Sequence, residues 1–394
     1  MSPERIDRSS KSPPTILLSG MIAAVPEQGG ATWAVLQYLR GFRRLGYRVV
    51  FVESIPETSL SPEGSPPDRT RNAAYFRRVM GDFGFDSDSA LLVAGTRQAV
   101  GLSYEELRRV ARSAEVLINI SGMLTDEELT RDIPCRVYLD LDPTFNQFWH
   151  ALHVCDMRFR GHTHFVTIGL GIGRSDCTVP TCGLHWITTP QPVVLSDWPV
   201  ARRITHDALT TVGHWRSYGS IEHEGTLYGQ KAHSIRRFIT LPTLTDERFL
   251  LALAIHPDER KDLAALAANG WHLLDPAQVA RTPADYRRFI RGSKAEFGIA
   301  KSGYVDSRCG WISDRSLCYL ASGRPVLAQQ TGFGHFIPAG EGLFAFESTE
   351  DILAAIEEVR SNYARHARAA RAIAEEVFDS DKVLSRLLER LSTT

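Results

Sequence analysis

Short apolar runs and amphipathic stretches alternate along the chain, which is the pattern of α/β proteins. Residues 15–20 (TILLSG) and 47–54 (YRVVFVES) are apolar enough to be buried strands. Between them, residues 32–46 place Trp33, Leu36, Leu39 and Phe42 at helical spacing, and Gly46 ends the stretch. A strand, a helix and a second strand in this order predict a βαβ unit with parallel strands.

The alternation continues, so the whole chain is expected to be α/β. A proline-rich crossover at residues 188–202 separates two sets of elements, and the second set starts near Ala208. Since 394 residues are too many for one ordinary core, we expect two domains. The predicted limits are a disordered lead-in at 1–14, a first domain at 15–200, a second at 201–360 and C-terminal helices at 361–394.

Residues 291–346 carry the most ordered series of signals. A helical run at 314–322 is stopped by Gly323 and followed by Pro325, and PVLAQQ then supplies a short buried strand. The loop TGFG (331–334) opens at the carboxyl end of that strand, before a second short strand, LFAF. Ligands bind at this end of the strands in open α/β sheets, so the loop is a candidate binding element.

Composition removes several classes of protein. A formal net charge of -1 argues against nucleic acid or an anionic membrane as partner. No apolar run reaches membrane-spanning length, and the first residues lack the apolar core of a signal peptide. Six cysteines without a secretory signal fit reduced thiols, so we expect a cytoplasmic protein without integral membrane contact.

Two motifs tempt a ligand assignment that their spacing does not support. The glycines of residues 164–173 (HFVTIGLGIG) do not form a dinucleotide-binding fingerprint, and no clear helix follows them. Cys177, Cys182 and His185 lie close together, but the spacing is wrong for zinc fingers or ribbons. We therefore expect neither a dinucleotide nor a metal.

The series helix, ASGRPVL, glycine-containing loop and AGEGLFAF resembles the donor-binding half of GT-B glycosyltransferases, and most closely the GT4-like and spore-protein CgeB-like groups. The resemblance covers the second half of the chain well and the first half loosely. It implies two Rossmann-like domains facing across a cleft, with a C-terminal helix that can cross back to the first domain. It also implies metal-independent, retaining transfer from a nucleoside diphosphate sugar, with UDP or GDP as the expected nucleotide and no cofactor. The expected acceptor is a small molecule or a glycan, and oligomeric state is left open.

The resemblance also implies residues for the donor. Gly29 and Gly30 begin a helix, where backbone N–H groups and the helix dipole favour a phosphate, although a tight turn also needs small residues. Arg216 and Lys231 stand where the family has an arginine and a lysine on the donor phosphates, and Arg315 begins the helix before ASGRP. The predicted donor-binding residues are Gly29, Gly30, Arg216, Lys231, Asp314, Arg315, Thr331, Gly332, Phe333 and Gly334.

One departure from the family concerns its paired-glutamate motif, Glu-x7-Glu. This chain has Gly310 and Cys318 at the two positions, so both carboxylates are missing, and Asp314 is a candidate replacement at the ribose. An inverting mechanism would need a base, for which Asp140, Asp142 and His162 (or His164) are candidates. Two other functions stay open: a nucleotide-sugar epimerase of the same fold, and a non-catalytic relative that binds carbohydrate or nucleotide.

Overall fold

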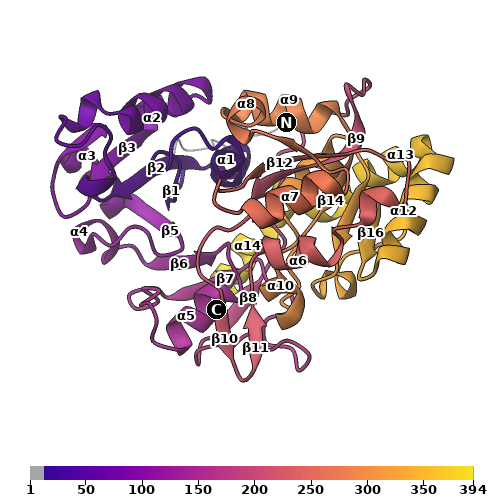
Figure 1. The fold of residues 1–394 in the computed structure, drawn as a ribbon. Helices are drawn as coiled ribbons and strands as arrows, with labels where there is room; N and C mark the ends of the chain where they lie inside the picture. Colours follow the sequence, from indigo (N-terminus) through magenta and orange to yellow (C-terminus); the bar gives the residue numbers. More distant parts are fainter. Residues whose placement is uncertain (1–12, 394) are drawn as a thin grey trace, which may run out of the picture.

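The computed structural model describes residues 13–393, so most of the predicted lead-in lies outside the described residues. Within this range the strands form an eight-stranded sheet, a six-stranded sheet and a two-stranded hairpin. Figure 1 shows the first sheet in indigo and magenta beside the second in red and orange. The expected α/β architecture with two Rossmann-like sheets is confirmed, whereas the domain limits stay a prediction.

The first sheet has the strand order β4-β3-β2-β1-β5-β6-β7-β8, and all neighbouring strands are parallel except β3 and β4. The strand order reverses between β1 and β5, which makes that point the switch of this sheet. The strands are β1 (Thr15–Ser19), β2 (Arg48–Ile55), β3 (Ser89–Val93), β4 (Ala99–Gly101), β5 (Ala114–Ile120), β6 (Cys135–Asp140), β7 (His164–Thr167) and β8 (Trp186–Thr188). The helices are α1 (Gly29–Arg44), α2 (Arg71–Asp82), α3 (Tyr104–Ser113), α4 (Glu127–Thr130) and α5 (Phe145–Ala151).

The second sheet is wholly parallel and has the order β13-β12-β9-β14-β15-β16, which is the Rossmann order 3-2-1-4-5-6. Its switch point therefore lies between β9 and β14. The strands are β9 (His206–His214), β12 (Phe249–Ala254), β13 (His272–Leu274), β14 (Ser293–Gly298), β15 (Val326–Gln329) and β16 (Leu343–Phe346). The helices are α6 (Lys231–Arg237), α7 (Arg260–Ala268), α8 (Pro276–Val279), α9 (Pro283–Gly292), α10 (Ser302–Ser307), α11 (Asp314–Ala321), α12 (Thr349–Ser361), α13 (Tyr363–Ile373) and α14 (Ser380–Thr393).

The last helix crosses back to the first half of the chain, as expected for the fold. After a π-helical turn (Ala374–Phe378), α14 packs against α1, and Asp381 pairs with Arg44 at 2.8 Å. A β-bridge joins Asp379 to Val193 just before this helix. Figure 1 shows the yellow C-terminal helix reaching back toward the first sheet.

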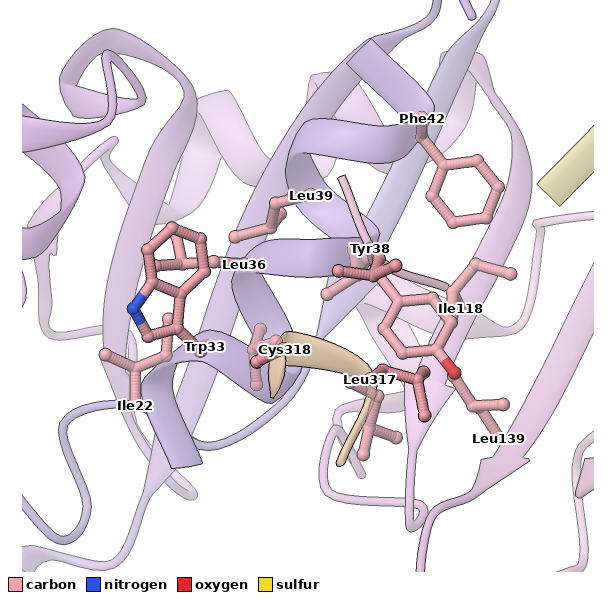
Figure 2. Close-up of a cluster of buried hydrophobic side chains, with 14 of the residues drawn as sticks. Ile22, Trp33, Leu36, Tyr38, Leu39, Phe42, Ile118, Leu139, Leu317 and Cys318 are labelled. Atoms are coloured by element: carbon pink, nitrogen blue, oxygen red, sulfur yellow. The ribbon is translucent and has the colours of Figure 1, made fainter. Parts of the chain in front are cut away.

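One continuous core joins the two halves. Figure 2 shows Leu317 and Cys318 of α11 packed against the side chains of α1, among them Trp33 and Tyr38. Trp33 is 1% exposed, and its indole nitrogen donates to the carbonyl of Pro283 at 2.8 Å. The relative position of the sheets is thus set by buried apolar contact as well as by hydrogen bonds.

The two halves of the chain also meet through backbone hydrogen bonds between residues 171–178 and residues 307–309. The Gly171 N–H donates to the Cys309 carbonyl at 2.9 Å, and the Thr178 N–H donates to the Ser307 carbonyl at 3.0 Å. A side chain on Gly171 would sit 2.6 Å from the Arg308 carbonyl oxygen. Gly171 of GLGIG is therefore explained by close backbone packing, and Gly173 by its positive φ of 90°.

Candidate functional site

A cavity of about 280 Å³ lies between the sheets, at the carboxyl ends of β6, β9 and β14. This is the switch point of the second sheet, where ligands of doubly wound folds bind. From the first half of the chain it is lined by Ala34, Leu141, Asp142 and Gln191. From the second half it is lined by Gly213, His214, Ser217, Gln230, Lys231, Lys301, Tyr304, Trp311, Ser313, Asp314 and Arg315.

Lys231 is the most unusual charge in the cavity. It begins α6, its residue is 8% exposed, and no described residue gives its ammonium a hydrogen bond or an ion pair. Burial, together with the nearby charge of Arg315, holds the pKa of Lys231 well below its usual range. A buried cation without a partner destabilises the fold, so its place in a cavity indicates an anionic ligand.

Arg315 and Glu296 form a buried ion pair on the wall of the same cavity. Arg315 Nε lies 2.6 Å from Glu296 Oε1, and Nη1 donates to the Val212 carbonyl at 2.8 Å. The second η nitrogen of Arg315 is buried without a partner, as is the second oxygen of Glu296. Burial works against the charge of Arg315, but Glu296, Tyr286 and Asp314 together outweigh it and leave the pKa of the guanidinium raised. Arg315 therefore keeps one buried donor without a hydrogen-bond partner.

Asp142 is the carboxylate that the first domain contributes to the cavity. It follows β6, and Lys301 Nζ from the second domain lies 3.2 Å from its Oδ1. The hydroxyls of Tyr218 and Tyr304 also hydrogen-bond to this carboxylate. Burial and the charge of Asp142 raise the pKa of both phenols far above their usual range, so both stay protonated donors.

Two further titratable groups line the cavity without an ion pair. Asp314 is half-buried at the start of α11, where the helix N-terminus favours its charge, and burial raises its pKa. His214 ends β9, and no described residue hydrogen-bonds to its ring. Burial and the charges of Lys231 and Lys301 lower the pKa of His214, so the imidazole is neutral at neutral pH.

The cavity thus gathers three of the predicted donor-binding residues, Lys231, Asp314 and Arg315, and one predicted catalytic residue, Asp142. Arg216 lies elsewhere: its Nε is 2.5 Å from Glu259 Oε1, and more than a third of its side chain is exposed. Strand β9 ends at His214, and the chain then turns, which carries Arg216 away from the cavity. His214, the last residue of β9, lines the cavity instead.

Gly29 and Gly30 are not brought to the cavity either. The Gly29 N–H donates to the Ala280 carbonyl at 2.9 Å, and a Cβ on Gly29 would sit 2.3 Å from the Thr282 carbonyl oxygen. A Cβ on Gly30 would meet the Tyr286 ring at 2.9 Å. The pair permits close approach of α1 to the second domain, which gives these glycines a packing role, and their contact with phosphate stays a prediction.

The TGFG loop also turns away from the cavity. The Phe333 side chain is 0% exposed in the core, and the Thr331 hydroxyl donates to the Trp311 carbonyl at 2.5 Å. Gly332 has a φ of 94° and packs against the backbone of Arg308, and the Gly334 N–H donates to Gln330. These four residues form a turn behind Trp311 that does not line the cavity, and their contact with the sugar stays a prediction.

Asp140 and His162 have structural partners. The Asp140 carboxylate is 0% exposed and accepts from Asn146, Gln147 and Thr167 at 2.6–2.7 Å. Burial raises its pKa. His162 bonds to Asn119 at 3.0 Å and to the Phe159 carbonyl, and burial lowers its pKa. Neither lines the cavity, and the alternative His164 bonds to its neighbour Thr163.

The surroundings of Gly310 and Cys318 account for the absence of a carboxylate at the two positions of the Glu-x7-Glu motif. Gly310 has a φ of 76° and lies against the Gly171 amide, which leaves no space for a side chain. Cys318 is 2% exposed and faces Gln37 of α1. Burial holds the pKa of its thiol well above the usual range. Asp314, the predicted ribose contact, lines the cavity.

The sequence reasoning missed Lys301, Tyr218, Tyr304 and His214. Lys301 had a usable signal, because a lysine directly after a buried strand lies at the ligand-binding end of the sheet. The two tyrosines had no local signal, because they lie 76 and 162 residues away from Asp142 in the sequence. Among residues 13–393 no cluster of three or more His, Cys, Asp and Glu side chains is arranged to hold a metal ion, and the six cysteines are free.

A scan against protein-family models finds no match, and a search of curated proteins finds none. Solved structures of similar fold are numerous. The Anabaena protein Alr3699/HepE in complex with UDP-glucose is 14% identical with a TM-score of 0.59, over 96% of this chain and 100% of that one. A glycosyltransferase from Rickettsia africae ESF-5 is 11% identical with a TM-score of 0.51, over 97% and 99% of the two chains.

A third structure, an α-glucosyltransferase in complex with UDP and a 13-mer DNA containing an HMU base, is 12% identical with a TM-score of 0.61, over 96% and 99% of the two chains. At identities this low, the structural likeness shows the fold alone. The chain has the GT-B fold with two Rossmann-like domains. The GT4-like or CgeB-like grouping stays a prediction.

The DNA complex overturns one expectation. A net charge of -1 was taken to exclude a nucleic-acid partner, yet a protein of the same fold is found with UDP and DNA bound. Net charge averages over the whole surface, whereas binding depends on the charges of one face, so the exclusion was wrong. Separately, no helix in the described part of the chain has the length and apolar content needed to cross a bilayer.

Proposed function

We propose that the protein is a glycosyltransferase that moves a sugar from a nucleoside diphosphate sugar to a hydroxyl acceptor. The observation that carries the proposal is the unpaired, buried ammonium of Lys231 at the switch point of a GT-B fold. Arg315 and Lys301 line the same cavity, so together with Lys231 it offers three cationic side chains to two phosphates. UDP is the first nucleotide to test because related folds are found with UDP or UDP-glucose, and GDP is the second.

The chemistry follows from the charges of the cavity. As the bond between the sugar and the diphosphate breaks, negative charge grows on the leaving phosphate and positive charge on the sugar ring. Lys231, Lys301 and Arg315 stabilise the first charge, so the reaction proceeds without a metal. Asp142 faces the cavity from the opposite domain and stabilises the second charge, and Asp314 binds the ribose. We assign the reaction to retaining transfer of the GT4-like kind.

The loss of both family glutamates supports one other function, a non-catalytic protein that binds the same nucleotide sugar. The two functions share the site, so ligand binding alone does not separate them. Hydrolysis or transfer of the donor does, because transferases often pass the sugar slowly to water. The acceptor screen covers small molecules, glycans and nucleic acids.

The deciding experiment compares Lys231→Met with Arg216→Met in titrations with UDP, GDP, TDP, CDP and their glucose conjugates, with and without EDTA. The wild type is expected to bind one of these nucleotides equally well with EDTA present. Lys231→Met should weaken binding about 10- to 100-fold, the worth of one charge-assisted contact to phosphate. It should also raise the melting temperature of the free protein, since an unpaired buried charge is removed.

Arg216→Met is the matched control, because it removes a cation that lies outside the cavity in a partly exposed pair. It should change neither property appreciably. If Lys231→Met bound every nucleotide as the wild type does, or if the wild type bound none, the proposal would be wrong.

A further inference from the structure

His214 is a titratable group of the cavity that neither an ion pair nor a hydrogen bond from any described residue engages. It ends β9, the strand beside the switch point, and its residue is open to solvent. Gly213 precedes it, and a Cβ on Gly213 would lie 3.0 Å from Lys231 Nζ. The histidine backbone is thus within a few ångströms of the buried ammonium.

We propose that His214 takes up a proton when the diphosphate of the nucleotide sugar enters the cavity, and that it then serves as a fourth cation of the diphosphate site. The inference rests on the proposed function and adds a specific residue and a proton to it. Binding of the donor becomes coupled to pH, whereas a site made only of permanent cations would bind independently of pH near neutrality.

The surroundings of His214 decide its charge in the free protein. The ionisable groups that line the cavity with it are Asp142 after β6, Lys231 of α6, Lys301 and Tyr304 at α10, and Asp314 and Arg315 of α11. Partial burial of the ring at the cavity lowers its pKa, although the residue as a whole is exposed, and the charges of Lys231 and Lys301 lower it further. Asp142 pairs with Lys301 and accepts from two tyrosines, and with its charge in place the pKa of His214 is still lowered. The free imidazole is therefore neutral.

A bound diphosphate reverses this balance. It places two negative charges among these cations, and an opposite charge within a few ångströms typically raises a pKa by about 1–3 units. For an imidazole whose ordinary pKa is close to neutral, such a change moves it from neutral to protonated. Lys231 is the competing site for the proton, because its pKa is also lowered in the free protein.

The test is calorimetric titration of the full chain with UDP-glucose, or GDP-glucose if that is the conjugate it binds, at pH 7.5 in Tris, HEPES and PIPES. Both phosphates of a nucleotide sugar are diesters without a proton near neutrality, so a dependence of the binding heat on the buffer reports protons taken up by the protein. We expect uptake of between about half and one proton, and an affinity that falls up to about tenfold per unit as pH rises through the coupled range.

The variants His214→Asn and His214→Gln should abolish the buffer dependence and flatten the pH profile, while binding at pH 8.5 stays close to that of the wild type. His256→Asn is the control, since His256 is exposed outside the cavity. Binding by the wild type without proton uptake would overturn this inference and leave the proposed function standing. Uptake that persists in both His214 variants and disappears in Lys231→Met would assign the proton to Lys231 instead. Failure of the UDP, GDP, TDP and CDP conjugates to bind would overturn the proposed function and this inference together.

Discussion

Lys301 Nζ lies 3.2 Å from Asp142 Oδ1, although the two residues follow strands of different sheets. Each follows the carboxyl end of a strand, β6 for Asp142 and β14 for Lys301. The pair therefore joins the ligand-binding edges of both sheets at the cavity. Its charges are opposite, as are the charges that a glycosyl transfer creates on the sugar ring and on the leaving phosphate.

We expect Asp142→Asn to separate donor binding from transfer. Removing this negative charge makes the cavity more cationic, so the nucleoside diphosphate should bind as tightly as to the wild type or several-fold more tightly. The sugar ring loses its facing carboxylate, so kcat for transfer or donor hydrolysis should fall about 100-fold or more. Titration and a coupled nucleotide-release assay measure the two quantities.

Two other aspartates supply the controls. Asp156→Asn changes an exposed carboxylate with 81% of its side chain accessible and should leave both quantities unchanged. Asp140→Asn should instead lower the free energy of unfolding by about 2–3 kcal/mol, because an amide cannot accept all the hydrogen bonds of the buried carboxylate. A kcat unaffected by Asp142→Asn would exclude the catalytic role.

Arg315→Met should destabilise the protein strongly. It leaves Glu296, whose side chain is 0% exposed, without its ion-pair partner, and breaking a buried pair typically costs about 3–5 kcal/mol. The double variant Arg315→Met/Glu296→Met should recover much of that stability and still bind the nucleoside diphosphate weakly. Urea unfolding and nucleotide titration test both statements. Equal stability of the single and double variants would contradict them.

Local sequence patterns predicted the elements well. The period of apolar residues placed α1 to within three residues and β2 to within one, and a proline-rich stretch marked the passage between the sheets. Lys231, Asp314 and Arg315 were found through the family resemblance, and each lies at the start of a helix at the ligand-binding edge of a sheet. Positions at a helix start can be predicted from the sequence because the signals that begin a helix lie within one turn of chain.

Contacts between distant segments could not be read in this way. Glycines at a strand–helix turn look the same whether a phosphate or another backbone approaches, and here the carbonyl of Thr282 approaches Gly29. Arg216 was suitable by type and place, but β9 ends at His214 and Arg216 pairs with Glu259 outside the cavity. The hairpin of β10 (Ile221–His223) and β11 (Thr226–Tyr228) follows Arg216 and lengthens the connection to Lys231.

Gly29→Ala should separate packing from phosphate binding. The added Cβ would lie 2.3 Å from a backbone oxygen, which cannot move as a side chain does, so we expect a loss of about 1–3 kcal/mol from overpacking. Gly81→Ala is the matched control: it lies in α2 with nothing within 4 Å of its Cβ, and it should stabilise that helix by up to about 1 kcal/mol. Unfolding midpoints decide between them, and a Gly29→Ala variant of normal stability that no longer bound nucleotide would restore the phosphate role.

Glu53 should make stability depend on pH. Its side chain is buried and accepts from the amides of Ile22, Ala23 and Ala24, but burial outweighs these bonds and raises the pKa to about 7. Because the unfolded value is near 4.5, the folded state binds the extra proton between these values. This contribution is fully present below about pH 4.5 and is lost as pH rises to about 7, a change of about 3 kcal/mol.

The variant Glu53→Gln removes the titrating group while keeping one oxygen for the three amides. Urea unfolding of the wild type and of Glu53→Gln at pH 5, 6, 7 and 8 should therefore give curves that diverge with pH. The wild type should lose stability relative to Glu53→Gln up to about pH 7 and run parallel to it above that pH. An exposed control, Glu224→Gln, with 85% of its side chain accessible, should follow the wild type at every pH. A wild type that gained stability relative to Glu53→Gln over this range would mean that the three amides outweigh burial and hold the carboxylate ionised.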